Sequence, residues 1–324
     1  MPKVSVIIPI YGVEQYIEQC ARSLFEQTLD DIEFLFIDDC TPDRSVDILK
    51  KVLEDYPSRK KQTIIHRMNS NSGQASVRKW GMQNAKGEYV IHCDSDDWVE
   101  LNIYETLFNY AVSTNSDIVY YDFYKSDGEK HTIIKRWKEQ FKDKYSFLRL
   151  LISAQVTGSV CGALCKRTLY QNNFTYPDAN MGEDLAMMLQ MAYNSTNRIS
   201  YISKPLYYYR DNMSSISKTH SMASIEKRIN DNIVNGEQMF MFLQKMGLTN
   251  TMTNEIEQYK FTVRKQYLPI LNKNGFYKKW KYCYPEINRH YLINKVASIR
   301  DKVLFVLCYL RLYHIVLKLR TIMS

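Results

Sequence analysis

The first 125 residues alternate between short apolar segments and amphipathic ones, and this alternation constrains the fold more than any other feature of the chain. Strands are predicted over residues 3–10, 32–38, 62–68, 88–93 and 117–123. The first of them, KVSVIIPI, is continuously apolar, as is typical of a strand buried on both faces of a sheet. Helices are predicted between the strands, over residues 13–28, 46–55, 74–85 and 100–113. Strands that alternate with helices predict an α/β fold with a mostly parallel, doubly wound sheet.

Acidic residues collect where these predicted strands end. Asp39 follows the second strand, and the fourth strand runs into HCDSDDWVE, with carboxylates at Asp94, Asp96 and Asp97. In an open α/β sheet, ligands bind outside the carboxyl ends of the strands, so one site is expected there. Mg²⁺ and Mn²⁺ prefer oxygen ligands, and a bound cation removes the repulsion between crowded carboxylates. The cluster therefore predicts a metal and a diphosphate, although Asp97 is expected to cap the next helix.

Two residues at neighbouring strand ends have the chemistry of a nucleotide pocket. Tyr11, after the first strand, could stack on a base, and Asp39 could accept a hydrogen bond from a base N–H. Either residue alone would be ordinary in a loop. Because the two strand ends are expected to be adjacent, the pair favours a nucleotide site, with ordinary loop residues as the alternative.

The pattern changes after residue 125. Segments 131–137 and 159–170 are predicted to be strands of a smaller mixed region, and MGEDLAMMLQMAYN (181–194) is predicted to be a loop that enters a helix. From about residue 222 the pattern is helical. We therefore divide the chain into an α/β domain over 1–218 and a helical region over 219–324. The α/β domain has a half in which the nucleotide site is expected, 1–125, and a second half, 126–218, which the family resemblance given below implies is the acceptor side.

The basic charge of the chain belongs to its last third. The net charge of +8 combines residues 1–203, with 23 basic and 27 acidic side chains, and residues 204–324, with 20 and 8. A basic region meets an anionic membrane, nucleic acid or an anionic substrate, or else it is a solvated helical surface. No recognised nucleic-acid-binding signature is present, so a nucleic-acid partner is not expected.

Residues 296–320 are predicted to form one amphipathic helix on a membrane surface. On a helix of about 3.6 residues per turn, four basic residues fall within roughly 60° of one another: Arg300, Arg311, His314 and Lys318. Much of the remaining circumference is apolar, as is typical of a helix in the membrane interface with its basic side toward the headgroups. The alternative is that the apolar face packs on the α/β domain or on a second subunit in a homodimer.

Cysteine usage and the N-terminus predict a cytoplasmic protein. The seven cysteines are scattered, as is typical of free thiols in a reducing compartment. The N-terminal segment lacks the features of a signal peptide, and no run reaches the ~18 apolar residues that span a bilayer. Attachment would then be peripheral, on the cytoplasmic face of the membrane.

Four motifs occur in the order found in a known family. They are VSVIIPIYGVEQYIEQCARSLFEQT, IEFLFIDDCTPDRS, NSGQASVRKWGMQNAKGEYVIHCDSDD and MGEDLAMM. Over roughly residues 2–215 the chain resembles the inverting glycosyltransferases of family 2, which have a GT-A fold and build polysaccharides and glycolipids. Four motifs in order are far more specific than one short pattern.

The resemblance implies roles for residues of the nucleotide-binding half. Pro9, Tyr11 and Glu14 match the segment that wraps the nucleotide, with Tyr11 against the base. Asp39 matches the acid that reads the uracil edge. Gly73 and Arg78 match the loop and helix that border the donor.

Further roles come from the Asp-x-Asp motif, Asp94-Ser95-Asp96, and from later motifs. Asp94 would face the ribose or the donor sugar, and Asp96 would bind Mn²⁺ or Mg²⁺ on the diphosphate of a UDP-sugar. Asp184 matches the catalytic base, and its alternative role is a helix cap. Arg210, in YYYRDNMSSIS, matches a segment that closes over the diphosphate. The acceptor would be a saccharide or a lipid-linked sugar, attacked with inversion.

Three departures from the family pattern bear on donor fit rather than on the carboxylates. Gly12 replaces an Asn, DDCTPD replaces a Gly-Ser after the paired acids, and Lys79 replaces an Asn. Two other functions stay open: a sugar-phosphate nucleotidyltransferase, which is expected to carry a Gly-rich loop after the first strand, and a non-catalytic nucleotide-sugar-binding protein. The segment PIYGVEQYI has no such loop, and the retained carboxylates favour catalysis.

Overall fold

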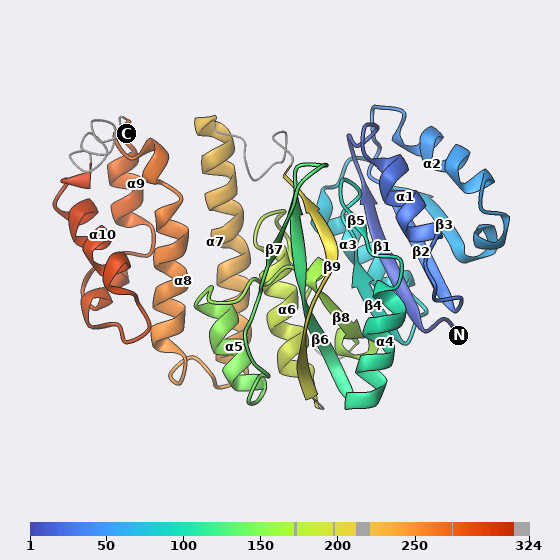
Figure 1. The fold of residues 1–324 in the computed structure, drawn as a ribbon. Coiled ribbons are helices and arrows are strands. Elements are labelled where there is room, and N and C mark those ends of the chain that lie inside the picture. The colour runs from blue at the N-terminus through green and yellow to red at the C-terminus, as the bar shows by residue number, and fades with distance from the viewer. Residues whose placement is uncertain (172–173, 197, 212–220, 274, 314–324) are drawn as a thin grey trace.

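The fold is an α/β sheet domain with a layer of helices on one side, as a computed structural model describes it (Figure 1). The structure describes residues 1–171, 174–196, 198–211, 221–273 and 275–313. The α/β domain contains the whole described sheet and the sequence motifs named above. The C-terminal helices lie beside it (Figure 1).

The first half of the sheet is built from four parallel strands. Their bounds are β1 Val4–Ile10, β2 Ile32–Asp38, β3 Thr63–Arg67 and β4 Tyr89–His92, in the order β3-β2-β1-β4. The connecting helices are α1 Ile17–Phe25, α2 Ser45–Glu54 and α3 Gln74–Asn84. In register, Val6 of β1 lies between Phe34 of β2 and Ile91 of β4. The predicted mostly parallel, doubly wound sheet is confirmed, although α1 is shorter than the predicted 13–28.

The second half of the sheet is mixed. Its strands are β5 Trp98–Val99, β6 Ser116–Ser126, β7 His131–Ile134, β8 Ala163–Lys166 and β9 Arg198–Arg210. Strand β8 inserts antiparallel between β4 and β6, and β9 pairs parallel to β6 and antiparallel to β5. The helices of this half are α4 Ile103–Thr114, α5 Lys144–Ile152 and α6 Glu183–Asn194.

The sequence patterns did not predict β5, β9 or α5. The failure to predict β9 has a physical reason. Pro205 lies inside this strand and pairs with Asp122 where the register shifts. A proline within a run argues against a central strand, and only such irregular positions tolerate it. The local sequence pattern therefore argued against a strand at β9, which forms because it pairs with β6 in the folded protein.

Two apolar clusters cover the two faces of the sheet. Val4, Val6 and Ile8 of β1 belong to one cluster, and Ile7 belongs to the other, as the period-two alternation of a strand requires. The cluster around Ile7 continues into the C-terminal helices, where it includes Trp280. The helical region is therefore packed on the sheet domain through a continuous buried layer.

The C-terminal layer consists of α7 Met222–Lys245, α8 Thr253–Lys265, α9 Phe276–Tyr282 and α10 Ile299–Tyr309, and α7 lies next to α6 (Figure 1). Short 3₁₀ helices cover Pro57–Gln62, Val160–Gly162, Arg167–Tyr170, Leu268–Ile270, Pro285–Asn288 and Tyr291–Ile293. The predicted boundary between 218 and 219 falls within residues 212–220, outside the described residues.

The helix predicted over 296–320 is shorter in the described residues. It begins at Ile299 and ends at Tyr309, and Arg311 has a left-handed backbone with φ of 61°. Arg300 and Arg311 therefore do not share one helical stripe, while His314 and Lys318 lie outside the described residues. Within the part of the chain that the structure describes, no helix has the length and apolarity to cross a membrane.

Candidate active site

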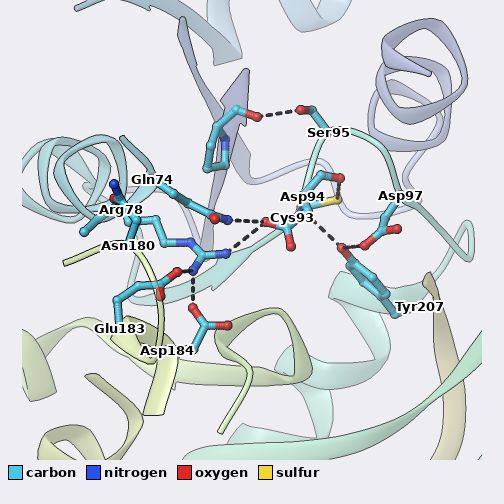
Figure 2. A network of polar contacts seen from close by, with 12 residues as sticks. Gln74, Arg78, Cys93, Asp94, Ser95, Asp97, Asn180, Glu183, Asp184 and Tyr207 are labelled. Atoms are coloured by element: carbon cyan, nitrogen blue, oxygen red, sulfur yellow. Dashed lines mark hydrogen bonds and ion pairs between the residues drawn. The ribbon is translucent and has the colours of Figure 1, made fainter. Parts of the chain in front are cut away.

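Arg78 joins the donor-side acid to the residues at the start of α6. Its buried guanidinium donates from Nη2 to Asp94 Oδ1 at 2.9 Å and from Nη1 to Glu183 Oε1 at 2.7 Å. Nη1 also pairs with the Asp184 carboxylate. Figure 2 shows the guanidinium pointing between these carboxylates, with Asp94 on one side and Glu183 and Asp184 on the other. The structure thus brings three predicted site residues, Arg78, Asp94 and Asp184, into direct contact.

One guanidinium faces three carboxylates, and burial adds to the electrostatic cost. Burial, and then the charge of Asp184, raises the pKa of Glu183 to about 8, against the opposing effect of Arg78. Burial also raises the pKa of Asp184, again opposed by Arg78. The site is therefore short of positive charge, which a divalent cation would supply.

Exposure distinguishes the two adjacent acids of α6. The Glu183 side chain is 7% exposed, whereas that of Asp184 is 27% exposed. Because a base must reach the hydroxyl that it deprotonates, only Asp184 is accessible for that chemistry. The first turn of α6 contains both acids, so a helix-terminal position does not by itself separate their roles.

The Asp-x-Asp loop is held at both ends by hydrogen bonds. Ser95 Oγ donates to Pro9 O on β1 at 2.6 Å, and Asp94 N donates to Tyr207 Oη at 3.1 Å. Tyr207 in turn donates to Asp97 Oδ2 at 2.6 Å, as Figure 2 shows. Strands β1 and β9, which are far apart in the sequence, therefore fix the same loop.

The prediction that Asp97 caps the next helix is wrong. The residue before α4 is Asn102, and Asp97 is 2% exposed and bound to β9 instead. Asp97 Oδ1 accepts the Arg210 backbone N–H at 2.7 Å. Burial, and then the charges of Asp96 and Asp94, raises the pKa of Asp97 well above its ordinary value. Asp97 is thus a buried acid that ties β9 to the Asp-x-Asp loop.

Arg210 lies over the Asp-x-Asp loop at the end of β9. Its Nε donates to the Asp96 backbone carbonyl at 2.7 Å, and its guanidinium lies 4.5 Å from the Trp98 ring centroid and 4.9 Å from that of Tyr16. Trp98 is itself buried and stacked on Tyr208, so it is a packed aromatic. Most of the segment after Arg210, residues 212–220, lies outside the described residues.

The residues predicted to bind the nucleotide base lie at the ends of β1 and β2. Tyr11 is 51% exposed, which leaves its ring available for stacking. Asp39 is buried, and its two oxygens accept the backbone N–H groups of Ser72 at 2.7 Å and Gly73 at 2.8 Å. Asp39 therefore holds the loop before α3, and each oxygen retains capacity for a further donor.

Gly73 is required by both its backbone and its surroundings. Its φ is 80°, and a Cβ built on it would lie 2.2 Å from the Asn180 side chain. Asn180 Oδ1 accepts the Ala75 N–H at 3.1 Å, which satisfies one free donor at the start of α3. Any larger residue at position 73 would displace this contact.

Glu14 is a predicted site residue that lies away from the carboxylate cluster. Its Oε2 lies 3.6 Å from Arg44 Nε and accepts the Arg44 N–H at 3.1 Å. Its own N–H donates to Asp43 Oδ2 at 2.9 Å. Glu14 therefore joins the loop after β1 to the loop after β2.

The residues present fit a divalent cation only with help from a substrate. The carboxylates of Asp94 and Asp96 are hard oxygen groups of the kind that Mg²⁺ and Mn²⁺ take as ligands. Among the described residues, no group of three or more His, Cys, Asp or Glu side chains is arranged to hold a metal ion. The donor set therefore suits a cation that also binds phosphate oxygens, which is usual for Mg²⁺.

Several contacting residues were not among the predicted site residues. Gln74 donates to Asp94 Oδ1 at 3.2 Å, and Asn180 and Tyr207 make the contacts described above. Gln74 and Glu183 adjoin Gly73 and Asp184, so proximity to a motif could have found them. No local sequence pattern marks Asn180 or Tyr207 as a site residue. Asn180 reaches the site from a loop, and Tyr207 reaches it from β9, a strand that was not predicted.

A comparison with protein-family models identifies the domain. Residues 5–174 match the model described as "Glycosyl transferase family 2". This chain belongs to glycosyltransferase family 2. The predicted resemblance is therefore confirmed, and the chain is a glycosyltransferase rather than a member of a nucleotidyltransferase family.

Relatives and solved structures agree with this assignment. The chain is 29% identical to "Uncharacterized glycosyltransferase EpsJ" of Bacillus subtilis over 85% of its own length and 78% of that protein. It resembles the structure of S. aureus TarS 1–349 in complex with UDP-GlcNAc, with a TM-score of 0.64, 18% identity, and coverage of 96% and 88% of the two chains. The Mannosyltransferase PcManGT from Pyrobaculum calidifontis, solved with GDP-Man and Mn²⁺, gives a TM-score of 0.53 at 16% identity, with 94% and 79% covered. At these identities the structures show a shared fold.

Proposed function

We propose that this glycosyltransferase takes its sugar from a UDP-sugar and transfers it with inversion to a hydroxyl of a saccharide or lipid-linked acceptor. The observation that carries the proposal is the single guanidinium of Arg78, which binds both Asp94 and Asp184. The guanidinium of Arg78 thereby holds the proposed donor-side acid, Asp94, close to the proposed base, Asp184. The UDP-GlcNAc bound by the TarS structure supports a UDP-sugar donor.

In the proposed reaction, Asp184 accepts the proton of the acceptor hydroxyl as its oxygen attacks the anomeric carbon. The new C–O bond forms on the face opposite the bond to the diphosphate, which breaks and releases UDP. One displacement of this kind inverts the anomeric centre. Arg78 keeps the Asp184 carboxylate oriented, and the lower exposure of Glu183 leaves Asp184 to meet the acceptor.

Asp96, together with Asp94, would hold the Mn²⁺ or Mg²⁺ ion. When bound, this ion neutralises charge on the leaving diphosphate. The Mn²⁺ in the PcManGT structure supports a metal in this chain. Arg210, fixed on the Asp96 carbonyl, is the side chain that we assign to the diphosphate, and Tyr11 and Asp39 are assigned to the base.

We also propose that the basic C-terminal region meets the cytoplasmic face of an anionic membrane that carries the acceptor. Ile293, Ile299 and Val303 are exposed in the described part of that region. Residues 204–324 carry 20 basic and 8 acidic side chains, which complement anionic headgroups. Sedimentation with anionic and with neutral vesicles tests this. If the protein does not bind vesicles but sediments as a homodimer, the exposed apolar residues would instead contact a second subunit.

Nucleotide titration tests the donor and the metal. We expect UDP to bind more tightly with Mn²⁺ than without it, and more tightly than GDP or CDP, by calorimetry. Equal binding of the three nucleotides, or no effect of metal, would refute this proposal. A panel of UDP-sugars, assayed for hydrolysis, then identifies the sugar. Binding without any turnover would favour the non-catalytic alternative.

A further inference from the structure

One face of α7 carries three polar side chains that run along the loop before α6. Asp231, Asn235 and Gln238 are spaced by four and three residues, so they lie on the same side of the helix. The loop, residues 176–182, ends where α6 begins at Glu183. Helix α7 belongs to the C-terminal layer, which carries none of the sequence motifs of the family.

Two of the three side chains, Asn235 and Gln238, bind backbone groups of the loop. Gln238 Nε2 donates to Tyr176 O at 3.1 Å. Asn235 Nδ2 donates to the carbonyl oxygens of residues 179 and 181, at 2.8 and 2.9 Å, and its Oδ1 accepts the N–H of residue 179 at 3.3 Å. Burial raises the pKa of the Asp231 carboxyl, and the backbone of residue 180 opposes this shift. The loop is therefore bound along its length by side chains rather than by a strand ladder.

Asn235 is the central member of this set. It is 1% exposed, and both of its N–H donors and its oxygen are used on the loop. A buried amide that loses its hydrogen-bond partners is destabilising, because it has also lost its contacts with water. The match between Asn235 and the loop is therefore specific: a side chain without two donors leaves the loop carbonyls without this partner.

The loop that Asn235 holds reaches both halves of the active site. Toward the donor side, Asn180 Oδ1 accepts the Ala75 N–H at the start of α3 and packs over Gly73. Toward the acceptor side, Gly182 takes a left-handed backbone with φ of 80° and leads directly into Glu183 and Asp184. A Cβ at Gly182 would lie 2.8 Å from Asn232 Oδ1 of α7, so the helix also shapes this turn.

We infer that Asn235 is a positioning residue of the transferase, which acts through the 176–182 loop to set Asp184 relative to Arg78 and the start of α3. The inference rests on the proposed role of Asp184 as the base. It gives the C-terminal helical layer a part in the reaction: this layer fixes the loop from which the base projects. Misplacing a reacting group by about 1 Å can cost up to about a hundredfold in rate.

The experiment compares two buried asparagines. Asn235→Asp keeps the shape and the acceptor oxygen but removes both N–H donors. Asn294→Asp is the matched control, because Asn294 is also buried and its Nδ2 donates to Asn254 O at 2.8 Å and Glu257 Oε2 at 3.0 Å, in the same helical layer but away from the loop. Gln238→Ala is a milder second variant, since Gln238 is only half-buried. The readouts are hydrogen exchange of residues 176–186, kcat, and the Kd for UDP with Mn²⁺.

For Asn235→Asp we expect faster exchange in residues 176–186 and a kcat about tenfold lower or more, with a smaller change in the UDP Kd. Gln238→Ala is expected to shift both readouts in the same direction by less. Asn294→Asp should leave exchange and kcat at wild-type values, even where it lowers the melting temperature. Unchanged exchange in both α7 variants, or equal losses of kcat in Asn235→Asp and its control, would overturn the inference.

The exchange readout separates this inference from the base assignment. Faster exchange with a slower reaction supports the loop contact whichever residue is the base. If Asp184→Asn proved fully active while Asn235→Asp slowed the reaction, the base assignment would fail and the positioning role would stand. If Asp184→Asn were inactive and exchange in Asn235→Asp were unchanged, the reverse would hold.

Discussion

The two sides of the active site are built in different ways. The proposed donor side, with Tyr11, Asp39 and Asp94, lies at the ends of parallel strands whose order and register follow from regular pairing. The proposed acceptor side, with Asp184, lies at the end of an irregular loop that helix α7 holds. Arg78 is the contact between them, because it binds an acid from each side. One half of the site is therefore positioned by the sheet and the other by tertiary packing.

Removing the proposed base should have the largest effect, and it tests whether the acceptor side carries the proton transfer. We expect Asp184→Asn to lower kcat by about 10²–10⁴-fold, the usual contribution of a general base. The Kd for UDP with metal should stay close to that of the wild type, because the donor side is intact. Turnover and calorimetry measure the two quantities. Unchanged turnover would show that the proton goes elsewhere.

Removing Arg78 should break the contact between the two sides. In Arg78→Met, three carboxylates lose their shared counter-charge, and we expect the free energy of unfolding to fall by about 3–5 kcal/mol, with loss of transfer. Urea denaturation measures the change. Arg22→Met is the control, since the side chains of Arg22 and of its partners Glu18 and Asp55 are all exposed, and such a pair contributes about 1 kcal/mol or less. Equal losses of unfolding free energy in both variants would show that Arg78 contributes no more to stability than an exposed ion pair does.

Tyr207 tests the support that β9 gives to the donor side. Tyr207→Phe removes the hydroxyl that accepts the Asp94 N–H and donates to Asp97. We expect a loss of about 1–3 kcal/mol in the free energy of unfolding, because buried groups are left with one partner fewer. Metal-dependent UDP binding should weaken as well, as calorimetry would detect. An unaltered metal dependence would show that the Asp-x-Asp loop keeps its geometry without β9.

Glu183 should have the smallest effect on activity and a visible effect on pH dependence. Its pKa is raised from 4.5 to about 8, so between these values the folded state binds a proton that the unfolded state has released. The stability of the wild type should therefore fall as pH rises from about 4.5 to about 8. Glu183→Gln resembles the protonated acid and should reduce this fall, with activity little changed near pH 7. Parallel stability curves for the two proteins, from melting at several pH values, would contradict the raised pKa.

Much of the donor side was predictable from local sequence. Strands β1 to β4 appear as apolar runs, and the acids that follow them must gather at one sheet edge because parallel strands share a direction. The Asp-x-Asp motif, Arg78 and Asp184 were found by their place in ordered motifs. Hydrophobic periodicity and strand ends are local properties, which is why a single sequence reveals them.

The tertiary structure alone decided how these parts are held together. Asp97 binds Tyr207 and Arg210, more than a hundred residues away, instead of capping the helix that follows it. Asn235 binds a loop more than fifty residues earlier in the chain. A buried polar side chain takes whichever partner packing brings to it, since leaving it unpaired is costly, and no local pattern encodes that partner. The sequence by itself determined which chemical groups this transferase has at its strand ends, and only packing decided which of them touch.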